Sequence, residues 1–160
     1  MMMINENLKV MKEESTANSL NPLTAIEIAV DTSYVASQNG NNISQGIYMM
    51  DNQEANGSSG EGTLELHTCC NVGSLIGFKC VPINALGTTG DTVEITGFTI
   101  SQGSVFSAAG QPVKQSDGSY WIGQALNTGT QTYQIQIKVT VGILHPVSYF
   151  VNWDPFITAQ

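Results

Sequence analysis

The stretch Tyr133-Gln134-Ile135-Gln136-Ile137-Lys138-Val139-Thr140-Val141 alternates apolar and polar residues without interruption. A period of two places every second side chain on the same face of a strand, so residues 133–141 predict a half-buried β-strand. No other segment of the chain alternates as cleanly. Gly142 and His145-Pro146 then end the run.

The last fourteen residues, 147–160, predict a final strand that is broken at Asp154-Pro155. The side chains that share one face of this strand are Val147, Tyr149, Val151 and Trp153. Proline has no N–H for a strand ladder, so pairing stops there. Because β-branched and aromatic residues dominate, we expect this strand to be buried in a sheet.

Shorter strand signals recur upstream, separated by turn residues. They cover residues 26–30, 47–50, 63–67, 75–83, 93–98 and 120–126, with a bulge expected at Gly77. Asp117-Gly118 is the strongest hairpin signal, because Asp-Gly suits turns that need a positive φ. No segment after residue 24 has a helical period. The pattern predicts an all-β protein, an antiparallel β-sandwich, with a closed β-barrel as the alternative.

Residues 1–23 are polar and charged without a clean period, and they predict a mobile tail before a single domain at 24–160. The N-terminus lacks the basic region and apolar core of a secretory signal. No run approaches the roughly 20 apolar residues of a membrane helix. These features predict a cytoplasmic protein.

The composition is weakly charged and acidic. Charged residues make up 11% of the chain and the net charge is −8, with five lysines and no arginine. Nucleic acid and anionic lipid both need clustered basic residues, so neither partner is expected. An amide-rich acidic surface is compatible with neutral sugars or with self-association.

The three cysteines, Cys69, Cys70 and Cys80, are an odd number, which does not indicate a disulfide framework. Cys69 and Cys70 are adjacent and point to opposite faces of a strand, so at least one is expected to be buried. There is no Cys-x-x-Cys, and His67 with Cys69 does not complete a zinc site. The sequence predicts neither a metal nor a cofactor.

No catalytic residues are predicted. His67 and His145 lack a Gly-x-Ser-x-Gly element that would place a nucleophile beside them. The acids within strands alternate with core residues and are expected to face solvent; they are Glu27, Glu65 and Glu94.

Asp31 and Asp154 each directly follow an apolar strand end. One interpretation is a turn or capping role, in which the carboxylate accepts backbone N–H groups. The other is a binding site at the rim of the sandwich, where these acids bind sugar hydroxyls while Tyr48, Trp121 or Trp153 stacks on a ring. Trp153 also fits a core position.

Several strings of residues occur in order over 26–160. They are Ile28-Ala29-Val30-Asp31-Thr32, Ile47-Tyr48-Met49-Met50, Gly62-Thr63-Leu64-Glu65-Leu66, Asn71-Val72-Gly73, Tyr120-Trp121, Gly129-Thr130-Gln131-Thr132-Tyr133 and Trp153-Asp154-Pro155-Phe156-Ile157. In this combination the chain resembles the PixA/AidA inclusion-body protein family of bacteria.

The resemblance implies a small β-sandwich protein without an established enzyme activity. Members of that family accumulate late in growth or under cell-density control, some as cytoplasmic inclusion bodies. With only 6 methionines, the chain departs from the methionine-rich members. We therefore expect a non-catalytic protein that self-associates, most simply as a two-fold dimer, and accumulates; a host- or neighbour-directed role is a further option. The alternative is a lectin-like module for a neutral glycan.

Overall fold

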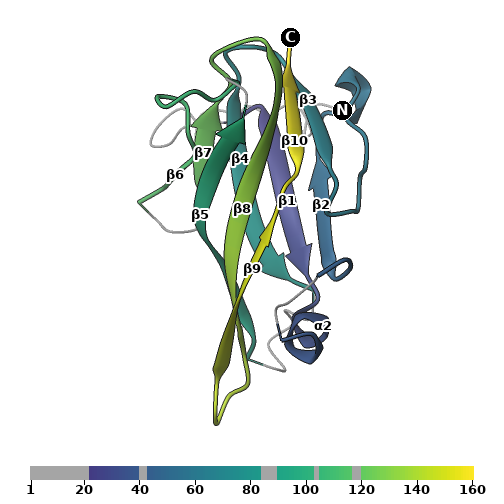
Figure 1. The fold of residues 1–160 in the computed structure, drawn as a ribbon, viewed down its shortest axis with the longest axis vertical. Coiled ribbons are helices and arrows are strands. Elements are labelled where there is room, and N and C mark those ends of the chain that lie inside the picture. The colour runs from purple at the N-terminus through teal and green to yellow at the C-terminus, as the bar shows by residue number, and fades with distance from the viewer. Residues whose placement is uncertain (1–21, 40–42, 84–89, 103–104, 117–119) are drawn as a thin grey trace, which may run out of the picture.

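The structure, a computed structural model, describes residues 22–39, 43–83, 90–102, 105–116 and 120–160. Two β-sheets pack face to face (Figure 1), which confirms the predicted sandwich. The first sheet has the strand order β2-β1-β4-β7-β6, and the second has the order β3-β10-β8-β5 with β9 also paired to β8. The elements are β1 (Thr24–Val30), α2 (Thr32–Ser37), β2 (Ile47–Asp51), the 3₁₀ turn η1 (Glu54–Asn56), β3 (His67–Cys70), β4 (Leu75–Pro82), β5 (Thr92–Gln102), β6 (Val113–Lys114), β7 (Trp121–Gln124), β8 (Gly129–Val141), β9 (Val147–Trp153) and β10 (Phe156–Ala159).

Strand β8 is the centre of the second sheet, and it contains the alternating run predicted from the sequence. Its buried side chains are Gln131, Tyr133, Ile135, Ile137 and Val139. One edge of β8 pairs with β5, while the other edge pairs first with β10 and then with β9. One thirteen-residue strand therefore pairs with three others.

Aromatic rings join the two sheets in the core. The ring of Phe78 on β4 lies 5.8 Å from that of Tyr133 on β8, in an edge-to-face arrangement. Phe98 on β5 lies 4.7 Å from Phe78, and Phe106 lies 5.7 Å from Tyr133. Edge-to-face and tilted contacts of this kind add to the stabilisation from burial.

Two of the strand pairings are parallel, although the sequence predicted antiparallel ones. Strand β1 runs parallel to β4, and β3 runs parallel to β10. The β1–β4 register is continuous, so the prediction of a bulge at Gly77 is wrong. Gly77 instead makes room for the Pro22 ring, because a Cβ atom there would lie 2.8 Å from Pro22 Cγ.

Three local predictions need correction or fall outside the description. The strand predicted at 63–67 is wrong, because Thr63 makes only an isolated bridge to Met49, residues 64–65 form a turn and β3 begins at His67. The helix α2 was not predicted; at six residues it is too short to show a period, and the Asp31 carboxylate caps it by accepting the Tyr34 N–H at 3.0 Å. The Asp117-Gly118 turn and residues 1–21 lie outside the described residues.

The final segment is two strands rather than one. Pro155 separates β9 from β10, and its carbonyl accepts the Tyr133 N–H at 3.1 Å, so β8 stays bonded across the break. The expectation that residues 147–153 are buried within a sheet is wrong in part. Strand β9 lies at an edge, where Phe150 is 54% exposed while Trp153 is only 7% exposed.

Trp153 is a core residue by this geometry, and its indole N–H donates to Met49 Sδ at 3.0 Å across the sandwich. We predict that Trp153→Ala lowers the free energy of unfolding by about 3–5 kcal/mol, because it leaves a large cavity. Val113→Ala, at an exposed position on β6, should change it by about 0.5 kcal/mol or less. Urea unfolding of both variants measures this, and a Trp153→Ala loss below about 1 kcal/mol would contradict the core assignment.

Candidate functional site

The five residues predicted to bind a ligand do not meet on one surface. Tyr48 points outward from β2, whereas Trp153 points between the sheets. Trp121 lies on β7, beyond β1 and β4, and its ring is 5.4 Å from Phe98. Asp31 caps α2, as one of its two interpretations predicted, and Asp154 is exposed in the break after β9. Sugar binding through these residues stays a prediction.

A groove of about 520 Å³ lies over the outer face of the first sheet and contains none of those five residues. Met50 and Tyr120 line it, and Gly77 is among the residues beneath. Its walls are mainly apolar. Asn52 does not point a free amide into it, because Asn52 Oδ1 accepts the Ala25 N–H and Asn52 Nδ2 donates to the Leu23 carbonyl.

The histidine and thiol groups have structural surroundings. His67 Nε2 is hydrogen-bonded to Thr158 Oγ1 at 2.6 Å, and His145 is exposed at the end of a hairpin. Burial raises the pKa of Cys70 to about 11 and that of Cys80 to about 12, so both thiols stay protonated near neutral pH. In the described part of the chain, no three His, Cys, Asp or Glu side chains lie close enough to hold a metal ion.

One segment, residues 58–63, covers an edge of each sheet; we call it the strap. Its C-terminal part bonds β2, with Met49 N–H donating to the Thr63 carbonyl at 3.2 Å and Gly62 N–H donating to the Met49 carbonyl at 2.7 Å. Its N-terminal part bonds β3, where Ser59 and His67 exchange two backbone hydrogen bonds. The strap therefore occupies backbone groups that β2 and β3 would otherwise expose.

A pair of carboxyl groups fastens the strap to β2. Glu61 Oε2 accepts the Asp51 N–H at 2.9 Å, which places the two carboxyl groups at the same junction between the strap and β2. Burial first, and then the Asp51 carboxyl, raise the pKa of Glu61 above its ordinary value of 4.5. Asp51 Oδ2 and Glu61 Oε1 are buried and have no hydrogen-bond partner among the described residues, so a proton on Glu61 would supply a donor at this place.

The edges at β5 and β6 are protected in other ways. Strand β5 has two register shifts along its pairing with β8, and exposes Glu94. Strand β6 is only two residues long and ends in Lys114. Bulges, charged side chains and short length are the usual devices that prevent one sheet edge from pairing with another.

Strand β9 has none of these protections. Seven consecutive residues pair with β8 in an unbroken register, and the strand contains neither a charged residue nor a proline. Its other backbone edge makes no hydrogen bond with any residue that the structure describes. An unbroken, uncharged edge strand is a template for pairing with another chain.

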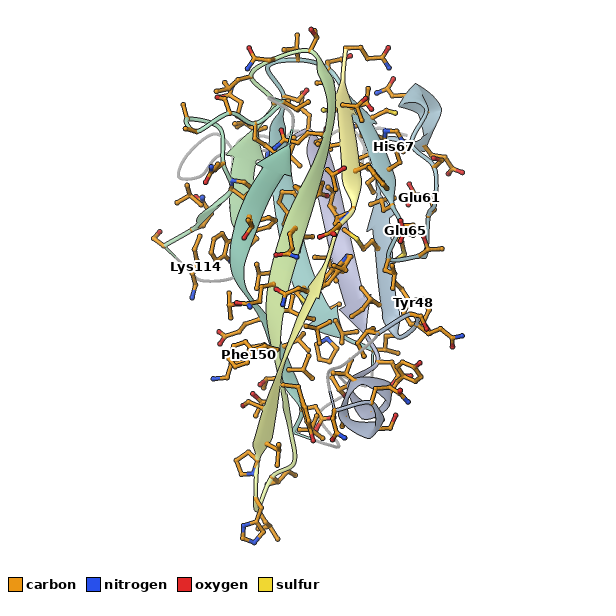
Figure 2. The ribbon with its side chains drawn as sticks, viewed as in Figure 1. Tyr48, Glu61, Glu65, His67, Lys114 and Phe150 are labelled. Atoms are coloured by element: carbon orange, nitrogen blue, oxygen red, sulfur yellow. The ribbon has the colours of Figure 1, made fainter. Side chains whose placement is uncertain are left out.

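The β8–β9 hairpin also projects from the body of the protein as a narrow arm, which we define as residues 138–150 (Figure 1). Figure 2 shows Phe150 where the arm leaves the body of the protein. The exposed apolar side chains of the arm are Ile143 (69% exposed), Leu144 (87%), Val147 (50%) and Phe150 (54%). A group of exposed apolar side chains this concentrated is typical of an interaction surface.

Sequence reasoning missed this surface. The signal was present, because residues 147–153 lack charge and proline. The sequence could not show that β10 begins only after Pro155 and that β9 has no second neighbour among the described strands. An edge is a relation between strands, so the pattern of one strand does not reveal it.

Comparisons with known proteins agree with the fold. Residues 23–144 match the family described as a domain of unknown function, DUF8788. The chain belongs to this family. The matched residues of the DUF8788 family end within the arm, at Leu144, and include β1 to β8. No curated protein matches the chain.

Among solved structures, the chain is similar to the crystal structure of an inclusion body protein, PixA, from Burkholderia cenocepacia J2315. The TM-score is 0.69 with 17% sequence identity, and the likeness covers 89% of this chain and 100% of that one. The resemblance drawn from the sequence is thus confirmed at the level of the fold. Among the described residues of this DUF8788 protein, no helix has the length and apolar character needed to cross a membrane.

The Glu61–Asp51 pair yields a prediction about pH. Since folding raises the pKa of Glu61, the folded protein binds more protons than the unfolded chain between the ordinary value of 4.5 and the raised one. The free energy of unfolding should therefore fall as the pH rises from about 4.5 and level off above the raised pKa. Glu61→Gln should remove this dependence, because the amide keeps an oxygen for the Asp51 N–H and offers an N–H to Asp51 Oδ2.

Glu65→Gln is the matched control, since Glu65 is exposed four residues further along the same segment (Figure 2). Urea unfolding of the three proteins between pH 4 and pH 8 measures the effect. Glu61→Gln should be at least as stable as the unmodified protein at pH 7. Parallel curves for all three proteins would show that the carboxyl pair does not couple to folding.

Proposed function

We propose that this protein is a non-catalytic, self-associating protein that accumulates in the cytoplasm, as the name of the inclusion body protein with the similar fold suggests for that protein. The partner is a second copy of the chain. The observation that carries the proposal is the arm, because its exposed apolar side chains have no role in the described core.

The charge distribution favours contacts between copies. Only 11% of the residues are charged, so little electrostatic repulsion separates molecules of this size. The residues of the arm include one charged side chain, Lys138, and its cross-strand neighbour on β5 is Glu94. Apolar contacts between arms would therefore form without bringing like charges together.

A structural role also agrees with the surroundings of the reactive groups. His67 is hydrogen-bonded to Thr158, while His145 lies on the exposed arm, so the two imidazoles lie in different parts of the molecule. The thiols of Cys70, which is buried, and Cys80, which is partly buried, remain protonated near neutral pH. These positions support a protein that acts through its surface.

The arm gives the test of this function. In sedimentation velocity from about 1 to 100 μM, the unmodified protein should exceed the monomer mass, and the double variant Ile143→Ser/Leu144→Ser should approach it because both replaced side chains are exposed and apolar. Val113→Ser is the control, since Val113 is 62% exposed on β6 of the other sheet. A monomer mass for the unmodified protein at every concentration would refute the proposal.

A further inference from the structure

The structure also indicates how two copies would meet, an inference that rests on the proposed self-association. We propose that β9 pairs antiparallel with β9 of a second copy, about a two-fold axis at Phe150. The contact would join the two second sheets into one sheet that continues through both molecules.

The outer backbone edge of β9 is suited to pairing with another strand. The outward N–H and C=O groups of an edge strand gain hydrogen bonds when another strand adds to the edge. Among the described strands, β9 alone combines an unbroken register, a length of seven residues and an absence of charge. The edges at β2 and β3 are already bonded to the strap, and the β5 edge is bulged. Addition of a strand is therefore most favourable at β9.

Symmetry and face alternation restrict the register. Residues directly opposite in an antiparallel pair point to the same face, so in a two-fold pair of identical strands one residue lies opposite its own equivalent, with the axis between them. Phe150 is the middle residue of Val147–Trp153. With the axis there, Phe150 lies opposite the partner's Phe150, and Ser148 lies opposite the partner's Asn152.

Side-chain chemistry explains why a second copy, rather than a different protein, suits this edge. The register places polar Ser148 beside polar Asn152 and covers the exposed Phe150 ring with its own equivalent. On the other face, Tyr149 meets the partner's Val151, so apolar side chains meet apolar ones. The chain has a net charge of −8, and this edge lets two acidic copies approach without acids facing each other.

The arm adds to the same contact. In this register Val147, which belongs to the arm and is 50% exposed, lies opposite the partner's Trp153. The strand pairing and the arm thus contribute to one interface.

Charge exchange at position 150 tests both the strand and the register. Phe150→Lys and Phe150→Glu should each raise the dimer dissociation constant by roughly 30-fold or more, because like charges replace a central aromatic pair. An equimolar mixture of the two variants should recover the dimer, since Lys then faces Glu. Recovery should weaken between about 0.05 and 0.5 M salt. The corresponding Val113→Lys and Val113→Glu variants, on exposed β6, should keep the mass of the unmodified protein.

Sedimentation velocity of the separate and mixed variants distinguishes the outcomes. Recovery only in the mixture supports the pairing centred on Phe150. Loss of the dimer in each variant without recovery in the mixture overturns this register, because residue 150 then does not lie opposite residue 150 of the second copy. If both variants keep the mass of the unmodified protein while Ile143→Ser/Leu144→Ser loses it, pairing through β9 is overturned and self-association through the arm stands. If the unmodified protein is a monomer throughout, the proposed function fails as well.

Discussion

The fold depends on β8, a thirteen-residue strand that has one long buried face and pairs along both of its edges. From Gln131 to Val139, every second side chain of β8 is buried, and these side chains supply much of the face that the second sheet turns to the first. Burying apolar area is the main stabilising term in folding, so the flanking strands must pair along the whole of β8. On one edge β5 does this alone; on the other edge the chain uses β10 and β9 in succession.

The pairing of β10 and then β9 with one edge of β8 explains both the break at Asp154-Pro155 and the outer edge of β9, which pairs with none of the described strands. Beside the first part of β8, β10 is flanked by β3, so the sheet continues outward to the strap. Beside the later part, β9 has no such neighbour among the described strands. The hairpin turn at residues 142–146 lies beyond the body of the protein, which leaves apolar side chains on the arm (Figure 1). The same strand that stabilises the core therefore creates the surface available to a partner.

Much of this architecture follows from local pattern. The alternation of residues 133–141 and the apolar run at 47–50 predict β8 and β2 because each face of these strands has a uniform environment. The break at Pro155 follows from the missing N–H. The parallel β1–β4 and β3–β10 pairings could not be predicted, since they join residues far apart in the sequence. The helix α2 depends on one cap, the Asp31 carboxylate, and on burial of Val35 rather than on a repeated pattern.

The site was harder to predict than the fold, for a physical reason. Aromatic and acidic residues such as Trp153 and Asp31 attract attention as ligand groups, yet the structure uses Trp153 in the core and Asp31 as a cap. The surface with the strongest physical case is made of ordinary residues, Ser148, Phe150 and Asn152, on a strand whose outer backbone edge pairs with none of the described strands. What distinguishes that strand is its position beside β8, which only the assembled sheet shows.

Hydrogen exchange of the β9 amides at two protein concentrations tests the central claim most directly. In an antiparallel ladder every second N–H of β9 faces β8 and the others face outward. The account predicts that the outward amides of residues 147–153 are protected well above the dissociation constant and exchange rapidly well below it, while the amides facing β8 change little. The samples' masses must show a dimer at the higher concentration and a monomer at the lower one. Equal exchange of the outward amides in those two samples would contradict the pairing through β9.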